Sequence, residues 1–502
     1  VYTNLLLFHY NLFNHLYCRP HSFSLEYSRA KCWTLSLATI VILDCRCLHL
    51  PSALALIIPA VHLTEFGMIC FGYRFVNQPT SIGHWGVNRF SCQSLSFFPR
   101  KCEKGYELMV LLLLVVFFAQ YSNAIHDPEQ FMCPLRVINY HGYPAERHEA
   151  VTEDGYIITL FRIPRGKAIM GNTASNTTKR PPVLFQHGLL SSSWDAVSNL
   201  PNKALGFVLA DAGFDVWMTN SRGNIYSPNH VNLTSADEAY WKFSWYEMAQ
   251  YDIPAAVNKV LDETGREKLY LIGHSQGTLV SFAAAVLNHD LKEKITHFYA
   301  LAPLITAQNL RGFWLNTFVF FRDVIEAVFK SSNDAISSMP ILHPICAHVP
   351  IFFASCDFFI SDFSGPSTQV NHTRVPVFTA KFPAGTSKRN LIHWGQMTTM
   401  YGTRPFDEGM EGNLDKYGTL FPPPIDWKSF SIPSTLFYSP ADNLASSEDV
   451  MNLLSILPRS SITAAHNLTD FNHSDFVWGQ RARREIYDRI IAHMKKLESS
   501  KG

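Results

Sequence analysis

The chain has 502 residues, of which 47% are hydrophobic and 17% are charged, and its formal net charge is +1. This length suffices to bury a hydrophobic core, and the composition excludes a mainly disordered chain. The near-neutral net charge does not indicate a basic surface for nucleic acid, and it argues against a protein that binds membranes through a polybasic segment.

The composition changes near Met109. Residues 1–108 carry nine Lys/Arg, five Asp/Glu and seven of the ten cysteines, whereas the remaining residues carry 33 Lys/Arg and 36 Asp/Glu. The odd cysteine count, without a repeated spacing, does not indicate a disulfide-stapled domain. An apolar stretch at residues 35–61 is interrupted by charges, which are costly inside a bilayer, so we expect no stable transmembrane anchor. We therefore predict that residues 1–108 are translated upstream sequence or a wrong gene model.

A signal peptide is predicted at residues 109–124. Residues 110–119 are a nearly unbroken apolar run that is too short to span a bilayer, and small residues lead to a cleavage site near Ala124. The alternative interpretation is a buried core helix. Secretion is supported by N-x-S/T sequons, which we predict to be glycosylated at Asn176, Asn232, Asn371 and Asn467.

After residue 125, short apolar runs alternate with helical patterns. This alternation is typical of an α/β fold, with a mainly parallel central sheet. The predicted strands are residues 182–186, 214–218, 268–272, 297–301, 434–438 and 462–465. The predicted helices are residues 251–261, with a stop at Gly265, and residues 278–287, 447–457 and 476–497.

The alternation breaks at residues 306–431, which are rich in phenylalanine. An insertion of this size between sheet strands predicts a helical cap or lid. The α/β core is then divided into a first part at residues 125–305 and a second part at residues 432–502. About half of the aromatic residues in the insertion are expected to form its own core.

A candidate nucleophile lies in residues 273–277, which read Gly-His-Ser-Gln-Gly. The motif follows a predicted strand and opens a predicted helix, which is the setting of a nucleophile elbow, so Ser275 is the candidate. Small residues must flank the serine because this turn is tight. The alternative interpretation is a glycine-rich turn with a surface serine.

A serine nucleophile needs a histidine that accepts its proton and a carboxylate that orients the histidine. In a strand–elbow–helix hydrolase the acid and then the base follow the serine in the chain. Asp442 follows a predicted strand, and His473 precedes the C-terminal helix, so we predict these two residues as acid and base. His466 is the rival base, and Asp415 and Asp426 are rival acids.

Acyl transfer also requires N–H donors for the oxyanion that develops on the substrate carbonyl. We expect one from the residue after the nucleophile, Gln276. The other is expected from the loop that begins His187-Gly188, at the Leu189 amide.

Residues 140–494 resemble the family of gastric and lysosomal acid lipases, within the α/β-hydrolase superfamily. The resemblance rests on motifs in family order at residues 143–146, 152–156, 186–190, 211–217, 220–224, 243–248 and 273–277. At matching positions it implies Ser275 as nucleophile, Asp442 as acid and His473 as base, with Leu189 and Gln276 as oxyanion donors. The family's cap carries a disulfide, and Cys346 and Cys356 lie in the corresponding region. Cys133 would then be a free thiol.

The resemblance implies a secreted or lysosomal carboxylic ester hydrolase that acts on neutral lipid at a lipid–water interface. Its substrates would be triacylglycerols, diacylglycerols or sterol esters. We expect no metal and no cofactor, because the chain lacks a zinc-protease motif, a P-loop and a dinucleotide fingerprint. A catalytically silent lipid-binding protein and a short-chain esterase are the alternatives.

The sequence departs from a plain match at Asn472, because Asn472-His473-Ser474 forms a sequon across the predicted catalytic histidine. A glycan there would be bulky beside the active site. We therefore predict that Asn472 is buried and unmodified.

Overall fold

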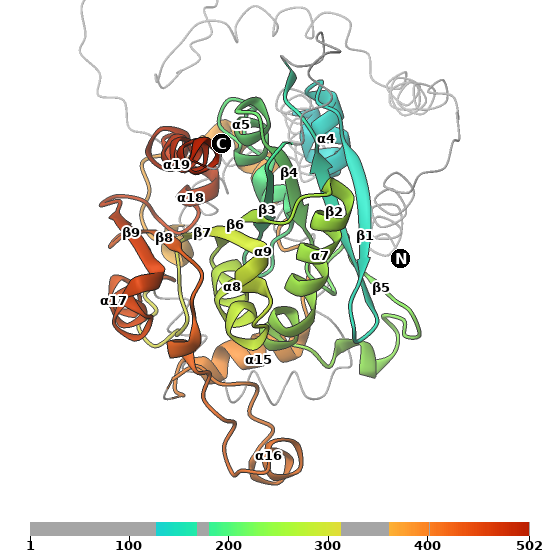
Figure 1. The fold of residues 1–502 in the computed structure, drawn as a ribbon, viewed down its shortest axis with the longest axis vertical. Coiled ribbons are helices and arrows are strands. Elements are labelled where there is room, and N and C mark those ends of the chain that lie inside the picture. The colour runs from blue at the N-terminus through green and yellow to red at the C-terminus, as the bar shows by residue number, and fades with distance from the viewer. Residues whose placement is uncertain (1–126, 168–179, 313–360, 401, 501–502) are drawn as a thin grey trace, which may run out of the picture. The chain divides into compact units, whose positions relative to one another are not determined.

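The computed structural model describes residues 127–167, 180–312, 361–400 and 402–500 (Figure 1). The predictions for residues 1–108 and for the signal peptide at 109–124 lie outside the described residues. The same holds for the sequon at Asn176 and for the predicted disulfide between Cys346 and Cys356.

A mixed, mainly parallel sheet organises the described residues. Its order is β1-β2-β4-β3-β6-β7-β8-β9, and β5 pairs with β2. The pairs β1–β2, β2–β4 and β2–β5 are antiparallel, whereas all pairs from β4 to β9 are parallel. The strands are β1 (Glu146–Val151), β2 (Tyr156–Ile163), β3 (Pro182–Gln186), β4 (Asp215–Thr219), β5 (Asn229–His230), β6 (Leu269–His274), β7 (Ile295–Leu301), β8 (Ser434–Tyr438) and β9 (Ile462–Asn467).

Helices flank this sheet (Figure 1). They are α4 (Pro134–Tyr140), α5 (Leu205–Asp211), α6 (Trp245–Glu247), α7 (Ile253–Thr264), α8 (Gln276–Leu287), α9 (Leu291–Lys294), α14 (Val375–Thr379), α15 (Lys388–Met397), α16 (Met410–Tyr417), α17 (Ser447–Ile456), α18 (Asp475–Trp478) and α19 (Asp488–Ser499). Every residue of β3, β4 and β6 is buried, so both faces of the sheet centre are covered. The predicted α/β fold class is confirmed.

Among the described residues, the sequence pattern located all six strands that pair in parallel but not the antiparallel edge. β1 and β2 were not predicted as strands. The predicted C-terminal helix at residues 476–497 is helical over most of its length but is not continuous, because the chain forms α18, a wide helical turn at Arg483–Tyr487 and then α19. The break begins at Gly479, where the backbone turns extended and an added Cβ would lie 2.5 Å from the Asp475 carbonyl oxygen.

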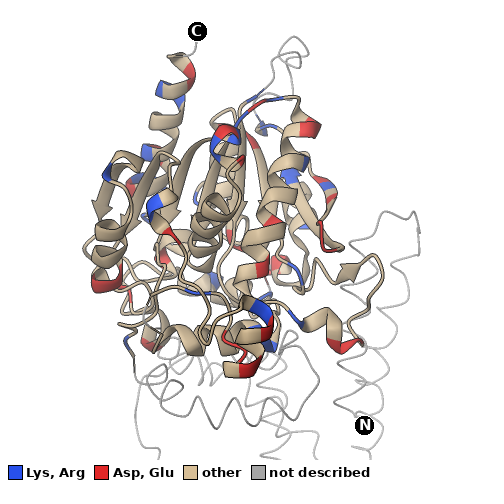
Figure 2. Ribbon diagram, turned by 60° about the horizontal axis from the view of Figure 1, so that its bottom comes forward, with Lys and Arg blue, Asp and Glu red and all other residues tan. Residues whose placement is uncertain are grey.

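Between β7 and β8 the chain leaves the sheet, and the described part of this excursion carries α14, α15 and α16. Charged residues of both signs are interspersed on the outer helices and loops (Figure 2). Within the residues that the structure describes, no helix is long and apolar enough to cross a membrane.

Candidate active site

The candidate nucleophile lies in a strained turn between β6 and α8. Ser275 has φ 54°, a backbone region that is unfavourable for a residue with a side chain. The turn also packs tightly, since a Cβ added at Gly277 would lie 2.3 Å from the Gln186 carbonyl oxygen. Glycine is therefore required at this position of the motif, and the serine is presented at the carboxyl end of a buried strand.

The structure brings Ser275, His473 and Asp442 together. Ser275 Oγ lies 2.6 Å from His473 Nε2, and His473 Nδ1 lies 2.8 Å from Asp442 Oδ2. Asp442 follows β8 and His473 follows β9, so parallel strands deliver all three side chains to one edge of the sheet. All three residues are buried, and Asp442 is fully so.

The hydrogen bonds of Asp442 determine which nitrogen of His473 carries a proton. The Leu444 and Ala445 backbone N–H groups each donate to Asp442 Oδ1 at 2.8 Å, which holds this carboxylate toward His473. A carboxylate only accepts, so His473 Nδ1 carries the imidazole proton. His473 Nε2 is then free to accept the Ser275 hydroxyl proton, as a general base must.

Two backbone N–H groups lie beside the serine without acceptors. Among the described residues, neither the Leu189 nor the Gln276 N–H donates a hydrogen bond. The loop with Leu189 is fixed by His187, whose Nδ1 donates to the Gly188 carbonyl at 2.8 Å and whose Nε2 accepts from the Ser221 N–H at 3.0 Å. Burial lowers the pKa of His187 to about 4, so the ring stays neutral and keeps this pattern.

Family comparisons agree with this geometry. A model described as the α/β hydrolase fold matches residues 181–473, and one described as a partial α/β-hydrolase lipase region matches residues 135–200. The chain belongs to the α/β-hydrolase family of lipases. Lipase lipl-1 of Caenorhabditis elegans is 40% identical over 73% of this chain and 92% of its own length. Human lipase member M is 35% identical over 78% of this chain and 94% of its own. A Crotalus adamanteus protein whose name includes lysosomal acid lipase/cholesteryl ester hydrolase is 36% identical over 74% and 92%.

As a member of this family, the chain is a carboxylic ester hydrolase of the lipase type. The rival residues of the sequence analysis lie away from the serine. His466 is on β9, where its ring stacks on Phe437 at 4.8 Å. Asp415 and Asp426 are exposed, and Asp426 caps a short helix through the Lys428 N–H.

Three further residues surround Ser275, His473 and Asp442, and their contacts were not identified from the sequence. His274 Nε2 donates to the His473 carbonyl at 2.9 Å, and the Ser364 carbonyl accepts from the His473 N–H at 2.8 Å. Burial, together with the nearby His473, lowers the pKa of His274 to about 3. Burial raises the pKa of Asp195 to about 7, against a hydrogen bond from Ser191 and the charge of His473. The contacts of His274 and Ser364 with His473 join segments far apart in the chain, so no local motif marks them.

Asn472 is fully buried, as predicted. Its Nδ2 donates to the Gly365 carbonyl and its Oδ1 accepts from the Asp475 N–H, both at 2.9 Å. Among the other sequons, Asn232 and Asn467 are exposed and Asn371 is half-buried.

Cys133 is disulfide-bonded, so the prediction of a free thiol is wrong. That prediction assigned Cys133 by elimination after pairing two cysteines that are neighbours in sequence. A disulfide depends on closeness in space, which sequence separation does not give.

Proposed function

We propose that this lipase hydrolyses fatty acyl esters of neutral lipids through an acyl-enzyme intermediate on Ser275. The observation that carries the proposal is the continuous hydrogen-bonded series from Ser275 Oγ through His473 to Asp442. In this role Ser275 is the nucleophile, His473 the general base and acid, and Asp442 the residue that orients the imidazole.

The reaction proceeds in two halves. Ser275 Oγ attacks the ester carbonyl carbon while His473 Nε2 takes the hydroxyl proton, and the carbonyl oxygen becomes an oxyanion. The Leu189 and Gln276 N–H groups stabilise that oxyanion, and His473 then protonates the departing alcohol. Water then attacks the acyl carbonyl carbon while His473 Nε2 takes its proton. The bond to Ser275 Oγ breaks, His473 returns the proton to that oxygen, and the fatty acid leaves.

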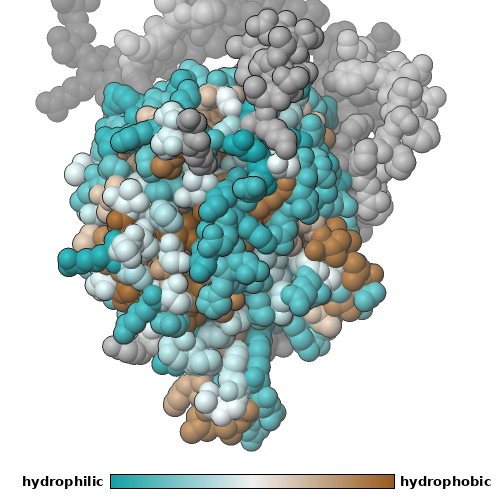
Figure 3. Space-filling model, in the orientation of Figure 1, coloured by the Kyte–Doolittle hydropathy of each residue, from teal (hydrophilic) through white to brown (hydrophobic). Residues whose placement is uncertain are grey.

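Apolar surface on the insertion supports a lipid substrate. Four large apolar side chains on and beside α16 are more than two-fifths exposed: Met410, Leu414, Leu420 and Phe421. The lower tip of the molecule in Figure 3, where Figure 1 places α16, is correspondingly brown. An exposed apolar cluster of this kind suits contact with a lipid–water interface.

We extend the proposal to triacylglycerols, diacylglycerols or sterol esters as substrates and to a secreted or lysosomal location. The name of the Crotalus adamanteus relative, which includes lysosomal acid lipase/cholesteryl ester hydrolase, supports both the sterol-ester class and the lysosome. The exposed sequons at Asn232 and Asn467 suit glycosylation in the secretory pathway.

The test is hydrolysis of emulsified triolein, cholesteryl oleate and a short-chain ester by wild type and Ser275→Ala, at acidic and neutral pH. We expect wild type to prefer a long-chain substrate and Ser275→Ala to lose at least about 1,000-fold in rate. Equal rates for the two proteins would overturn the serine mechanism. A rate that falls as the acyl chain lengthens would instead identify a short-chain esterase.

A further inference from the structure

The Gln276 side chain is anchored from outside the sheet. Its Oε1 accepts from Asn390 Nδ2 at 3.0 Å and from Trp394 Nε1 at 2.6 Å, and both donors lie on α15. Two donors occupy both lone pairs of one amide oxygen, which leaves the side chain a single orientation. Gln276 is only 2% exposed, so water does not compete for these bonds.

The orientation of Asn390 is fixed independently. Asn390 Oδ1 accepts from the Trp245 backbone N–H at 2.8 Å, and an N–H group can only donate. Asn390 Nδ2 must therefore be the atom that faces Gln276, and it also contacts Thr386 Oγ1 at 3.0 Å. Trp394 follows Asn390 by four residues on α15, so both side chains lie on the same helix face.

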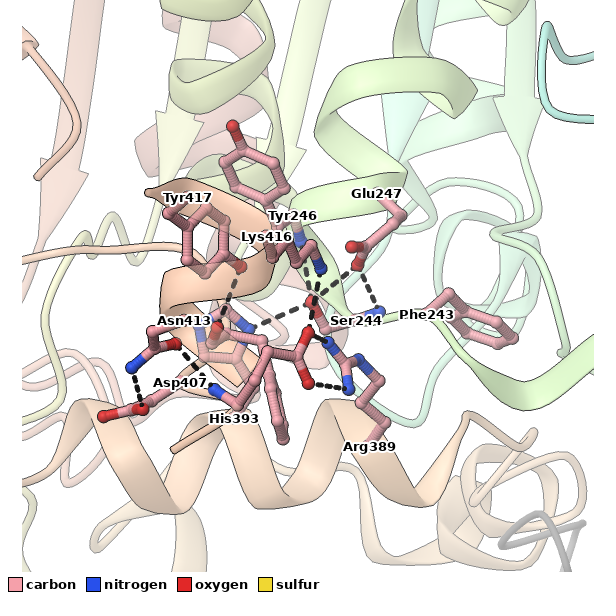
Figure 4. A network of polar contacts seen from close by, with 12 residues as sticks. Phe243, Ser244, Tyr246, Glu247, Arg389, His393, Asp407, Asn413, Lys416 and Tyr417 are labelled. Atoms are coloured by element: carbon pink, nitrogen blue, oxygen red, sulfur yellow. Dashed lines mark hydrogen bonds and ion pairs between the residues drawn. The ribbon is translucent and has the colours of Figure 1, made fainter. Parts of the chain in front are cut away.

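A dense polar network holds α15 in place (Figure 4). At its beginning, the Ser387 hydroxyl donates to the Phe243 carbonyl. Farther along, His393 Nδ1 lies 3.0 Å from Ser244 Oγ, and the His393 ring stacks on Trp245 at 4.7 Å. Arg389 pairs with Glu408, which also binds Lys416 of α16 at 2.9 Å. Helix α15 is thus held by polar contacts at several positions along its length.

We propose that Asn390 and Trp394 are positioning residues for ester hydrolysis: they hold the Gln276 side chain and thereby aim the Gln276 backbone N–H at the oxyanion. The proposal rests on the proposed function, because it concerns the oxyanion of that reaction. Ser275 is strained, and strained backbone persists only where its surroundings fix it. The two bonds from α15 supply that constraint on the residue next to the nucleophile.

The test is a double-mutant cycle between Trp394→Phe, which removes one N–H donor, and Gln276→Met, which removes the acceptor but keeps the backbone N–H. Each single variant is expected to lower kcat about tenfold, with KM changed less than about twofold, because only the transition state carries the oxyanion. The double variant is expected to match the more impaired single variant, since the shared bond is already lost. Trp241→Phe, which removes a Trp N–H bond of 2.8 Å to Ser235 in an exposed loop, is the matched control and should retain wild-type kcat.

A higher KM with unchanged kcat in Trp394→Phe, or a double variant whose loss is the product of the single losses, would overturn the positioning role. If Trp394→Phe does not fold, wild-type kcat in Gln276→Met would overturn it as well. The proposed function fails separately, when wild type shows no hydrolysis that depends on Ser275.

Discussion

Two regions meet at Gln276, and they are built in opposite ways. The turn at residues 273–277 is strained, since Ser275 has a positive φ. It also leaves no room for a larger residue, because a Cβ added at Gly277 would lie 2.3 Å from the Gln186 carbonyl oxygen. Helix α15 is unstrained, and a Cβ added at its Gly395 would have no atom within 4 Å. The turn therefore depends on steric fit, whereas α15 acts through a few hydrogen bonds. Substitutions in and around the turn should therefore lower kcat strongly. Substitutions on α15 should lower kcat only where they remove a hydrogen bond to Gln276.

The largest effect is expected at the triad carboxylate. Asp442→Asn replaces the acceptor of the His473 Nδ1 proton with an amide, which favours the wrong tautomer, so kcat should fall about 10⁴-fold. The matched control is Asp426→Asn in the insertion, where the carboxylate caps only an exposed short helix. Steady-state kinetics should show near-normal activity for the control. Comparable losses in both variants would contradict the specific role of Asp442 in orienting His473.

The next largest difference is expected when a methyl group is added to a glycine beside the turn or to a glycine of α15. A Cβ at Gly188 would lie 3.1 Å from Ser275 Cβ and 3.4 Å from His274 Nδ1, so Gly188→Ala should displace the nucleophile or the oxyanion loop. We expect kcat to fall roughly 100-fold, the size of losing one oxyanion donor. Gly395→Ala should keep its activity and gain up to about 1 kcal/mol of stability from helix propensity. Wild-type kcat in Gly188→Ala would show that the residues around Ser275 can move to accommodate a methyl group.

Substitution of His274 should lower kcat by less, and a side chain that keeps the hydrogen bond should restore part of the loss. His274→Leu removes the donor to the His473 carbonyl, and we expect kcat to fall about tenfold. His274→Gln, which keeps an N–H donor, should recover part of that loss. Because the pKa of His274 lies near 3, the ring is neutral at working pH, and the lower limb of the pH profile should not move. A shift of that limb in His274→Leu would mean that His274 itself titrates during the reaction.

Asp195 should affect stability rather than rate. Its pKa is about 7 in the folded protein, above the ordinary 3.8. Between pH 3.8 and pH 7, the Asp195 carboxyl is therefore protonated in the folded state and mostly ionised in the unfolded state. The free energy of unfolding then decreases as pH rises from about 4 to 7. Asp195→Asn should be more stable than wild type by about 4 kcal/mol at pH 8 and similar to it at pH 4. Denaturant unfolding at both pH values tests this, and a constant difference would argue against the raised pKa.

The sequence predicted the parts of the molecule whose signals are local. The β6–turn–α8 segment has its motif, strand and helix in one short stretch, and Asp442 and His473 follow recognisable strands. The α15 contacts with Gln276 were not predicted, because Asn390 and Trp394 lie more than a hundred residues away and form no pattern with it. His274 shows the same limit, since its role depends on a carbonyl 199 residues later. Edge strand β1 was missed because only one of its six residues is buried, so its sequence carries no apolar pattern. Strand β2 lies inside the sheet with six of its eight residues buried, so its apolar run is a local signal that was not used.

Covalent trapping tests the central claim most directly. A long-chain alkyl fluorophosphonate places phosphorus where the ester carbonyl would lie, and an activated serine attacks it. The account predicts one adduct per chain, located on Ser275 by peptide mass spectrometry and absent from Ser275→Ala. An adduct on another residue, or no adduct in enzyme that hydrolyses long-chain esters, would contradict it.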